Sequence, residues 1–239
     1  MSLDAAFDTP QAKHRYVRAL FATIADRYDF ITRFLSYGQD RRWKRTLIAR
    51  ADVRAGERVL DLASGTGDIA VAAADAGART IGLDITHRMM ELARARVSTR
   101  PRPIPFLTGD MTALPFATRS FDLVTTGYGL RNVPDLDTAI DEIARVLKPG
   151  GRLLSLDFNK PEHALVRAAY LGYLTVVGST LGLLLHGDPD TYRYIPASIR
   201  RYPGARGIAA RLSARGFERV EVVPLLFGLM TLHIAFRAP

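Results

Sequence analysis

The residues whose types could best support chemistry lie in a glycine-rich turn, Asp61-Leu-Ala-Ser-Gly-Thr-Gly-Asp-Ile-Ala70, which contains a G-x-G-x-x-A pattern. The glycines, Gly65 and Gly67, let the backbone approach a bound nucleoside closely. Asp84 ends the next apolar run, where a carboxylate can accept hydrogen bonds from both hydroxyls of a ribose. The spacing predicts an adenosine-containing ligand and fits a nicotinamide dinucleotide as well as S-adenosylmethionine.

Carboxylates around this turn favour S-adenosylmethionine. Asp61 ends the preceding strand, and Asp68 stands in the first helical turn, where a pyrophosphate would rest. Both would repel phosphate and attract the ammonium and sulfonium groups of S-adenosylmethionine. Asp110 ends a third strand and can accept a hydrogen bond from an adenine amino group. Taken alone, Asp68 also suits a helix dipole and Asp61 a turn cap, so the prediction rests on their combination.

Secondary-structure patterns explain how these residues are positioned. Short apolar runs that end in glycine or polar residues predict strands over 58–63, 80–84, 105–110, 121–126 and 151–158. Helical patterns lie between them, over 68–76, 86–98 and 135–147. Alternation of strands and helices predicts an α/β fold with a parallel, doubly wound sheet and helices on both faces.

The remaining segments flank this core within a single expected domain, 1–239. Apolar spacing predicts N-terminal helices over 11–50 with a break at 36–39, ahead of a donor-binding core over 58–158. Residues 159–206 form a helical insertion, or lid, on the substrate side. Residues 168–185 within it lack charged side chains, but their glycines and hydroxyls make a poor membrane span. A helix over 207–215 and strands over 217–223 and 226–236 close the domain.

Composition excludes several classes of protein. The chain has 239 residues and no cysteine, which excludes disulfides, thiolate metal sites and cysteine nucleophiles; no metal site is predicted. The first eight residues carry acids and lack the basic residues of a signal peptide, so we expect a cytoplasmic protein.

The charge distribution points to an anionic partner or to a solvated surface. Residues 1–50 carry 10 basic and 5 acidic side chains, residues 51–165 carry 14 and 15, and residues 166–239 carry 9 and 4. Basic flanks suit a nucleic acid or a membrane face. An arginine-rich solvated surface would produce the same pattern.

Several strings resemble a known family. Residues 59–68, 109–116 and 145–151 resemble motifs of class I methyltransferases. Narrower strings, from about Arg27 to His233, are similar to the ubiquinone/menaquinone biosynthesis C-methyltransferases. They are Arg27-Tyr-Asp-Phe-Ile-Thr-Arg-Phe-Leu-Ser-Tyr-Gly, Arg42-Trp-Lys-Arg, Tyr128-Gly-Leu-Arg-Asn-Val-Pro-Asp, Leu156-Asp-Phe-Asn-Lys-Pro, Tyr192-Arg-Tyr-Ile and Ser198-Ile-Arg.

The resemblance implies a Rossmann-like class I methyltransferase fold, with a seven-stranded sheet whose last strand is antiparallel. It implies S-adenosylmethionine as the donor. The acceptor would be a polyprenyl hydroquinone, either demethylmenaquinol or 2-methoxy-6-polyprenyl-1,4-benzoquinol. The family's donor-binding threonine falls on Thr66 and its ribose-binding aspartate on Asp84. Its adenine contacts fall on Asp110 and Met111, and a further donor contact falls on Gly127.

The chain departs from the family pattern at several places. Gly127 replaces a usual serine, Ser64 a glycine or cysteine, and Asp157 and Ala197 two glutamates; the residues after His233 also differ. These departures concern the acceptor more than the donor. They leave open a small-molecule O-, N- or C-methyltransferase derived from the same family.

Methylation of a ring carbon needs electron density from an adjacent phenolate, so the protein must favour the loss of a hydroxyl proton of pKa about 10. Arg131, after the fourth strand, is the candidate for stabilising the phenolate. Tyr128 and Asn132 are candidates for positioning the ring. Asp157, at the end of the fifth strand, is a candidate base, acting directly or through water.

The insertion supplies candidates for contact with the substrate. His186 is a weaker candidate base, and Tyr192 and Tyr194 are candidate lid contacts. The apolar insertion and the basic flanks together predict contact with a membrane surface, where a substrate with an isoprenoid tail would reside. A homodimer is a further expectation.

Two rival classes remain. Amino methylation of nucleic-acid bases typically uses Asn/Asp-Pro-Pro-aromatic after the fourth strand, where this chain has Thr126-Gly-Tyr-Gly-Leu-Arg-Asn. Carbon methylation of pyrimidines typically needs a cysteine, so no nucleic-acid partner is expected. A protein that keeps the donor pocket without turnover is the third class.

Overall fold

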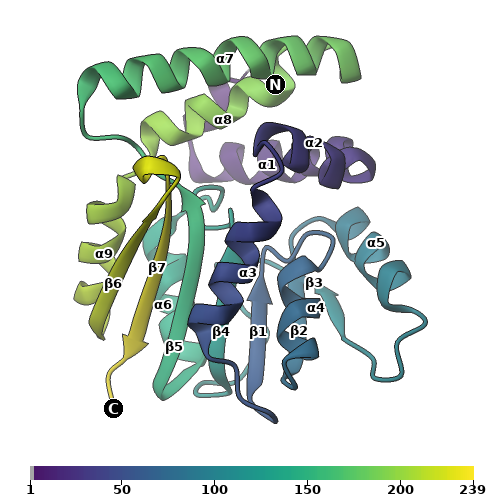
Figure 1. Cartoon of the computed structure of the whole chain (residues 1–239), viewed down its shortest axis with the longest axis vertical. Coiled ribbons are helices and arrows are strands. Elements are labelled where there is room, and N and C mark those ends of the chain that lie inside the picture. Colours follow the sequence, from purple (N-terminus) through teal and green to yellow (C-terminus); the bar gives the residue numbers. More distant parts are fainter. Residues whose placement is uncertain (1–2) are drawn as a thin grey trace.

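The computed structural model describes residues 3–239 and contains one seven-stranded sheet with helices on both faces (Figure 1). The strand order is β3-β2-β1-β4-β5-β7-β6. Neighbours among the first five strands pair in parallel, and β7 is antiparallel to both β5 and β6. The predicted α/β class and the antiparallel last strand are confirmed. The strands are β1 Arg58–Leu62, β2 Arg79–Asp84, β3 Phe106–Thr108, β4 Phe121–Gly127, β5 Leu147–Phe158, β6 Phe217–Leu225 and β7 Met230–Arg237.

The predicted helices are present, with small differences at their ends. They are α1 Pro10–Ile24, α2 Tyr28–Leu35, α3 Asp40–Ala51, α4 Asp68–Asp75, α5 His87–Val97, α6 Leu136–Val146, α7 Ala164–His186, α8 Asp190–Arg201 and α9 Gly204–Ala214. Short 3-10 turns cover Ala5–Phe7, Ala25–Arg27 and Leu226–Gly228. Strand β5 begins earlier than predicted because Leu147, ahead of the Pro-Gly-Gly turn, already pairs with Phe121.

Four helices cover one end of the sheet, and we call α1, α2, α7 and α8 the cap. Figure 1 shows the cap above the carboxyl ends of β1 and β4, with α7 outermost. Ligands of open α/β sheets bind beyond the carboxyl ends of the strands. The cap therefore encloses the edge of the sheet where a ligand is expected.

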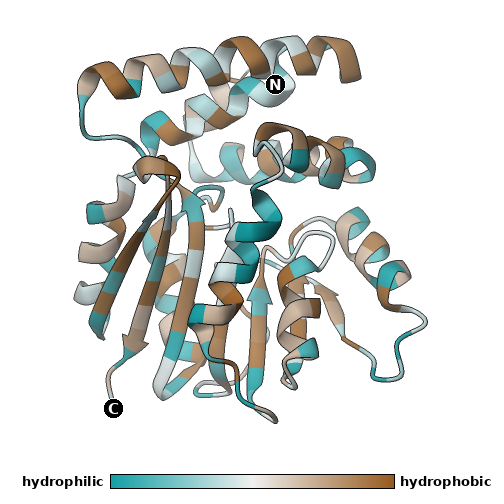
Figure 2. Ribbon diagram, viewed as in Figure 1, coloured by the Kyte–Doolittle hydropathy of each residue, from teal (hydrophilic) through white to brown (hydrophobic). Residues whose placement is uncertain are grey.

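Glycines on α7 allow the two outer helices of the cap to pack closely. A Cβ atom at Gly178 on α7 would lie 3.0 Å from the backbone oxygen of Tyr192 on α8, and one at Gly182 would collide with the backbone oxygen of Asp188. This close packing explains why glycines occur in α7 although they disfavour a membrane span. Within residues 3–239, α7 alone is long and apolar enough to cross a membrane, which by itself is weak support for a span. Apolar residues along it stand out in Figure 2.

Candidate functional site

A narrow cavity, which we call the donor cavity, lies between the glycine-rich turn and the cap. Five of the eight predicted donor-site residues line it: Gly65, Asp84, Asp110, Met111 and Gly127. The turn bends sharply because Gly65 and Gly67 adopt φ angles of 54° and 87°, in the left-handed region that glycine tolerates. The predicted convergence of the turn with the ends of β2 and β4 is therefore present.

Asp84 is held rigidly at the end of β2. Its carboxylate accepts the backbone N–H of Gly65 at 3.0 Å and that of Thr86 at 2.8 Å. The side chain is buried, and burial raises the pKa of its carboxyl above the usual value. A carboxylate fixed in this way can accept further hydrogen bonds from a ligand without losing conformational entropy.

Three predicted donor residues do not line the cavity. Asp61 is fully buried and accepts hydrogen bonds from Ser64 Oγ (2.7 Å), Thr125 Oγ1 (2.8 Å) and the N–H of Ala70 (3.1 Å). It therefore braces the turn from beneath, because its oxygens bind protein donors. Thr66 lies beside Gly67 in the turn, and its hydroxyl donates to Asp29 at 2.7 Å.

Burial raises the pKa of Asp61 to about 6. The hydrogen bonds from Ser64, Thr125 and Ala70 favour the charged form and oppose this rise. The folded state therefore prefers the protonated carboxyl, and this contribution to stability is lost as pH rises from about 4 through 6. We expect Asp61→Asn to remove about 2–3 kcal/mol of this pH dependence. Urea unfolding of the parent and the variant between pH 4 and 7.5 measures this difference. If the free energy of unfolding depended on pH in the same way in both proteins, the raised pKa of Asp61 would be contradicted.

Helix α1 forms the outer wall of the donor cavity through His14, Val17 and Phe21. His14 Nε2 lies 3.0 Å from Asp110 Oδ2, while Asp110 Oδ1 accepts the N–H and the hydroxyl of Thr112. The free space is about 70 Å³, smaller than the roughly 300 Å³ of typical ligand pockets. In this structure α1 therefore closes the cavity from outside.

A much larger apolar cavity, the acceptor cavity, lies beneath the cap and has a volume of about 580 Å³. Phe21, Tyr28 and Asn132 line both cavities, so the two compartments share a wall. Sequence patterns did not reveal Phe21 or Tyr28 as site residues, because either side chain reads as the apolar face of a helix. Ligands in the two cavities would therefore be neighbours.

Arg131 lines the acceptor cavity and forms a buried ion pair with Asp157. Its Nε lies 3.3 Å from Asp157 Oδ1, and its backbone N–H donates to Oδ2 at 3.1 Å. The guanidinium also contacts Ser198 Oγ and lies over the ring of Phe158. Burial raises the pKa of Asp157, and the charge of Arg131 opposes that rise.

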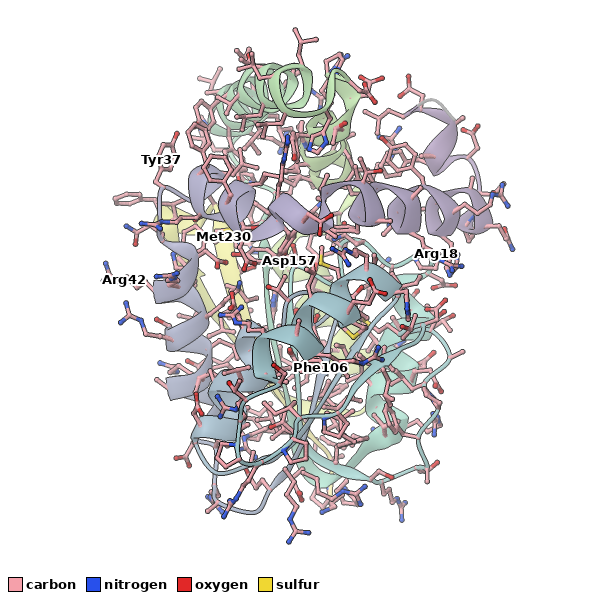
Figure 3. All side chains as sticks on the ribbon, turned by 90° about the vertical axis from the view of Figure 1, so that its right-hand side faces the viewer. Arg18, Tyr37, Arg42, Phe106, Asp157 and Met230 are labelled. Carbon is pink, nitrogen blue, oxygen red and sulfur yellow. The ribbon has the colours of Figure 1, made fainter. Side chains whose placement is uncertain are left out.

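Asp157 does not line the cavity. Figure 3 shows it below the helices of the cap and near the start of β7 at Met230. Its oxygens accept hydrogen bonds from Arg131 and from the N–H of Phe158 at 2.8 Å. The sequence-based hypothesis of a direct base at Asp157 has no support in this geometry, which makes the carboxylate the partner of Arg131.

Tyr128 and Asn132 form a second polar group in the cavity wall. Tyr128 has a φ angle of 62°, which is uncommon for a residue with a side chain. Its hydroxyl donates to Asp40 Oδ1 at 2.7 Å, and its carbonyl accepts Asn132 Nδ2 at 2.7 Å. Within residues 3–239, Asn132 Oδ1 is buried without a hydrogen-bond partner.

The predicted contacts from the insertion are partly in place. Tyr192 and Tyr194 line the acceptor cavity. His186 stands behind them, with its Nε2 2.9 Å from the hydroxyl of Tyr192, and does not line the cavity. Burial lowers the pKa of His186 below its usual value, and the position of the ring makes it a contact of Tyr192 at the back of the cavity wall.

Comparisons of the sequence with known proteins find methyltransferases. The model of the ubiE/COQ5 methyltransferase family matches residues 9–237. A demethylmenaquinone methyltransferase of Thermus thermophilus is 39% identical over 220 residues, covering 91% of this chain and 100% of that one. A ubiquinone/menaquinone biosynthesis C-methyltransferase of Rubrivivax gelatinosus is 38% identical over 226 residues, covering 95% and 88%.

Solved structures share the fold. An S-adenosylmethionine-dependent methyltransferase of Thermotoga maritima superposes with a TM-score of 0.68 at 20% identity, covering 92% of this chain and 99% of that chain. A phosphoethanolamine N-methyltransferase of Haemonchus contortus, solved with S-adenosyl-L-methionine, gives 0.62 at 17% identity, covering 83% and 53%. At these identities the likeness establishes the fold alone.

Proposed function

The chain belongs to the ubiE/COQ5 methyltransferase family, and we propose that it transfers the methyl group of S-adenosylmethionine to a ring carbon of a polyprenyl hydroquinone. The acceptor would be demethylmenaquinol or 2-methoxy-6-polyprenyl-1,4-benzoquinol. The observation that carries the proposal is the shared wall of Phe21, Tyr28 and Asn132 between the two cavities. One cavity has features of a nucleoside site, and the other has the size and apolar character that a quinol needs.

The residues of the donor cavity fit S-adenosylmethionine. Gly109 and Gly127 line it, and a Cβ atom at either would lie 2.9 Å from the end of the Leu83 or the Ile69 side chain. Asp84 would accept hydrogen bonds from the ribose. When bound, the donor supplies an electrophilic methyl group on a cationic sulfur. The chain contributes orientation and exclusion of water, since α1 closes over the site.

Arg131 would stabilise negative charge that develops on the quinol oxygen. Its guanidinium lines the acceptor cavity, and Asp157 and Ser198 fix its direction from behind. A preorganised positive group in a site without bulk water stabilises a phenolate more strongly than water would. Tyr192 and Tyr194 would contact the ring or the first part of the tail.

The test is an assay of the purified protein with S-adenosylmethionine and a panel of acceptors. The panel holds both quinols with long and with absent tails, a catechol and an aromatic amine. We expect a C-methylated quinol, identified by mass spectrometry and by NMR of the new methyl group. Transfer to the catechol or the amine, with none to any quinol, would contradict the proposal and support the small-molecule alternative.

We further propose that the cap rests on an anionic membrane surface. Phe227, Tyr37 and Val166 line the acceptor cavity and are also exposed, so the cavity opens to solvent among apolar side chains. Leu183 and Leu184 extend the apolar surface along α7. Burial of these residues in the acyl boundary would let a prenyl tail enter directly, and the basic flanks would attract the lipid head groups.

We expect the triple variant Leu165→Ser, Leu183→Ser and Leu184→Ser, at exposed positions of α7 outside the cavity lining, to lose flotation with anionic vesicles. Its KM for a long-tailed quinol should rise about tenfold, while its rate with a tailless quinol stays unchanged. Leu107→Ser, at an exposed site on β3, is the control. Undiminished flotation of the triple variant would contradict this proposal. A dimer in sedimentation that the triple variant abolishes would also contradict it, because a second copy of the chain would then cover the apolar surface of the cap.

A further inference from the structure

The wall of the acceptor cavity contains a second buried polar pair, Tyr128 and Asp40. Tyr128 follows β4 and Asp40 begins α3, so the two are 88 residues apart in the chain. Both are buried, and only Tyr128 lines the cavity. The tyrosine hydroxyl donates its hydrogen to Asp40 Oδ1 at 2.7 Å. The oxygen of that hydroxyl therefore keeps lone pairs that can accept a hydrogen bond from a ligand.

Asp40 is held in place by an ion pair and by the start of its helix. Lys44 Nζ lies 2.8 Å from its second oxygen and also contacts Asp68 on α4. The backbone N–H of Asp40 is bound by Ser36 Oγ, which fixes the start of α3. Tyr28 on α2 also lies beside this group, and burial raises its pKa to about 12, so it stays uncharged. Asp29, Arg33, Arg41 and Arg96 line the same small surface cavity as Asp40 and Lys44.

Tyr128 itself does not act as an anion. Burial, together with the nearby charges of Asp40 and Asp157, raises its pKa well above the usual value. The phenol therefore stays protonated at neutral pH and can only relay a proton. Asp157 is paired with Arg131 and does not line the cavity, whereas Asp40 is bound directly to the hydroxyl of Tyr128, a residue that does line it.

We propose that Tyr128 and Asp40 form a proton relay that removes the hydroxyl proton of the acceptor during methyl transfer. This inference rests on the proposed function. As the methyl–sulfur bond breaks and the methyl–carbon bond forms, the acceptor hydroxyl passes its proton to Tyr128 Oη, and Tyr128 passes its own to Asp40. The donor leaves as a neutral thioether. The ring carbon then loses its hydrogen to water, and the relay returns a proton to the ring oxygen.

A carboxylate suffices for this step because the acidity of the acceptor changes during transfer. An aromatic hydroxyl has a pKa of about 10, but the ring becomes cationic as the methyl group arrives, and its hydroxyl becomes far more acidic. General-base assistance of this kind contributes typically 10²–10⁴-fold to a rate. Asp40 acts through Tyr128, so it is a positioning residue and proton acceptor, and Tyr128 is the group that touches the acceptor.

The experiment compares Asp40→Asn and Tyr128→Phe with the parent protein on its quinol, from pH 6 to 10. We expect kcat to fall about 10²–10³-fold at pH 7, with unchanged affinity for the donor product S-adenosylhomocysteine by calorimetry. The deficit should shrink toward pH 10, where solvent ionises the quinol. Asp40→His should restore part of the rate and move the acidic limb to about pH 6.5, the usual pKa of histidine.

The matched controls keep the proposal falsifiable. Tyr202→Phe alters a buried tyrosine that does not line the acceptor cavity, and Asp137→Asn alters an ion-paired carboxylate on α6. Both should retain the parent rate and pH profile. A uniform loss at every pH in the relay variants, or no loss, would overturn the relay. A parent protein that methylates no quinol would instead overturn the proposed function.

Discussion

Replacing Arg131 with methionine should lower the free energy of unfolding by about 3–5 kcal/mol and reduce methyl transfer at least about 10²-fold. The stability loss arises because the carboxyl of Asp157, 1% exposed, would be buried without the cationic partner that now compensates it. The rate loss arises because the cavity would lose its fixed positive group. Urea unfolding and an assay with the preferred quinol measure the two effects separately.

A second substitution separates stability from chemistry. Arg131→Met combined with Asp157→Leu removes both charges, and we expect it to recover most of the lost stability, because an apolar pair of similar volume tolerates burial. It should not recover the rate. Arg152→Met, which breaks a less buried ion pair with Glu57 at the other end of β5, is the control and should retain transfer. Full activity in the double variant would show that Arg131 acts only on the fold.

Replacing Asp84 with alanine should weaken binding of S-adenosylmethionine by about 10²–10³-fold. Hydrogen bonds to a charged group contribute about 1.5–3 kcal/mol each, and the proposed ribose contacts would be lost. The backbone N–H groups of Gly65 and Thr86 would also lose their acceptor, so the turn would loosen. Titration calorimetry with S-adenosylmethionine and S-adenosylhomocysteine measures the affinity.

The control for Asp84 is Asp122→Ala. Asp122 also accepts a backbone N–H, from Arg58 at 2.9 Å, but it lies at the start of β4, away from the cavities. Both variants should lose similar stability, and only Asp84→Ala should lose donor affinity. Equal affinities in the two variants would place the donor elsewhere.

Local patterns explain why the central fold was predictable. The apolar runs at β1, β2 and β4 are buried on both faces of a parallel sheet, so they appear in the sequence as continuous stretches bounded by glycines and acids. The turn at Gly65 and the acid at Asp84 share a spacing that the strand–helix–strand unit imposes. These features depend on neighbours within about 30 residues, which a single sequence reveals.

The contacts that complete the site depend on distant segments. His14 meets Asp110 across 96 residues, and Tyr128 meets Asp40 across 88. Asp40 reads in the sequence as an acid in the first turn of a helix, where it would favour the helix dipole. Nothing in its local pattern indicates that α3 brings it under the cap, so the relay required the tertiary structure.

The order of the last strands has a consequence for how the protein folds while it is being translated. Strand β6 precedes β7 in the chain but pairs with the sheet only through β7, which lies between β5 and β6. On the ribosome, β5 therefore remains an open edge until the residues of β7 have left the exit tunnel. Unpaired edges of nascent sheets associate readily with other chains. We infer that the sheet closes only after translation of β7.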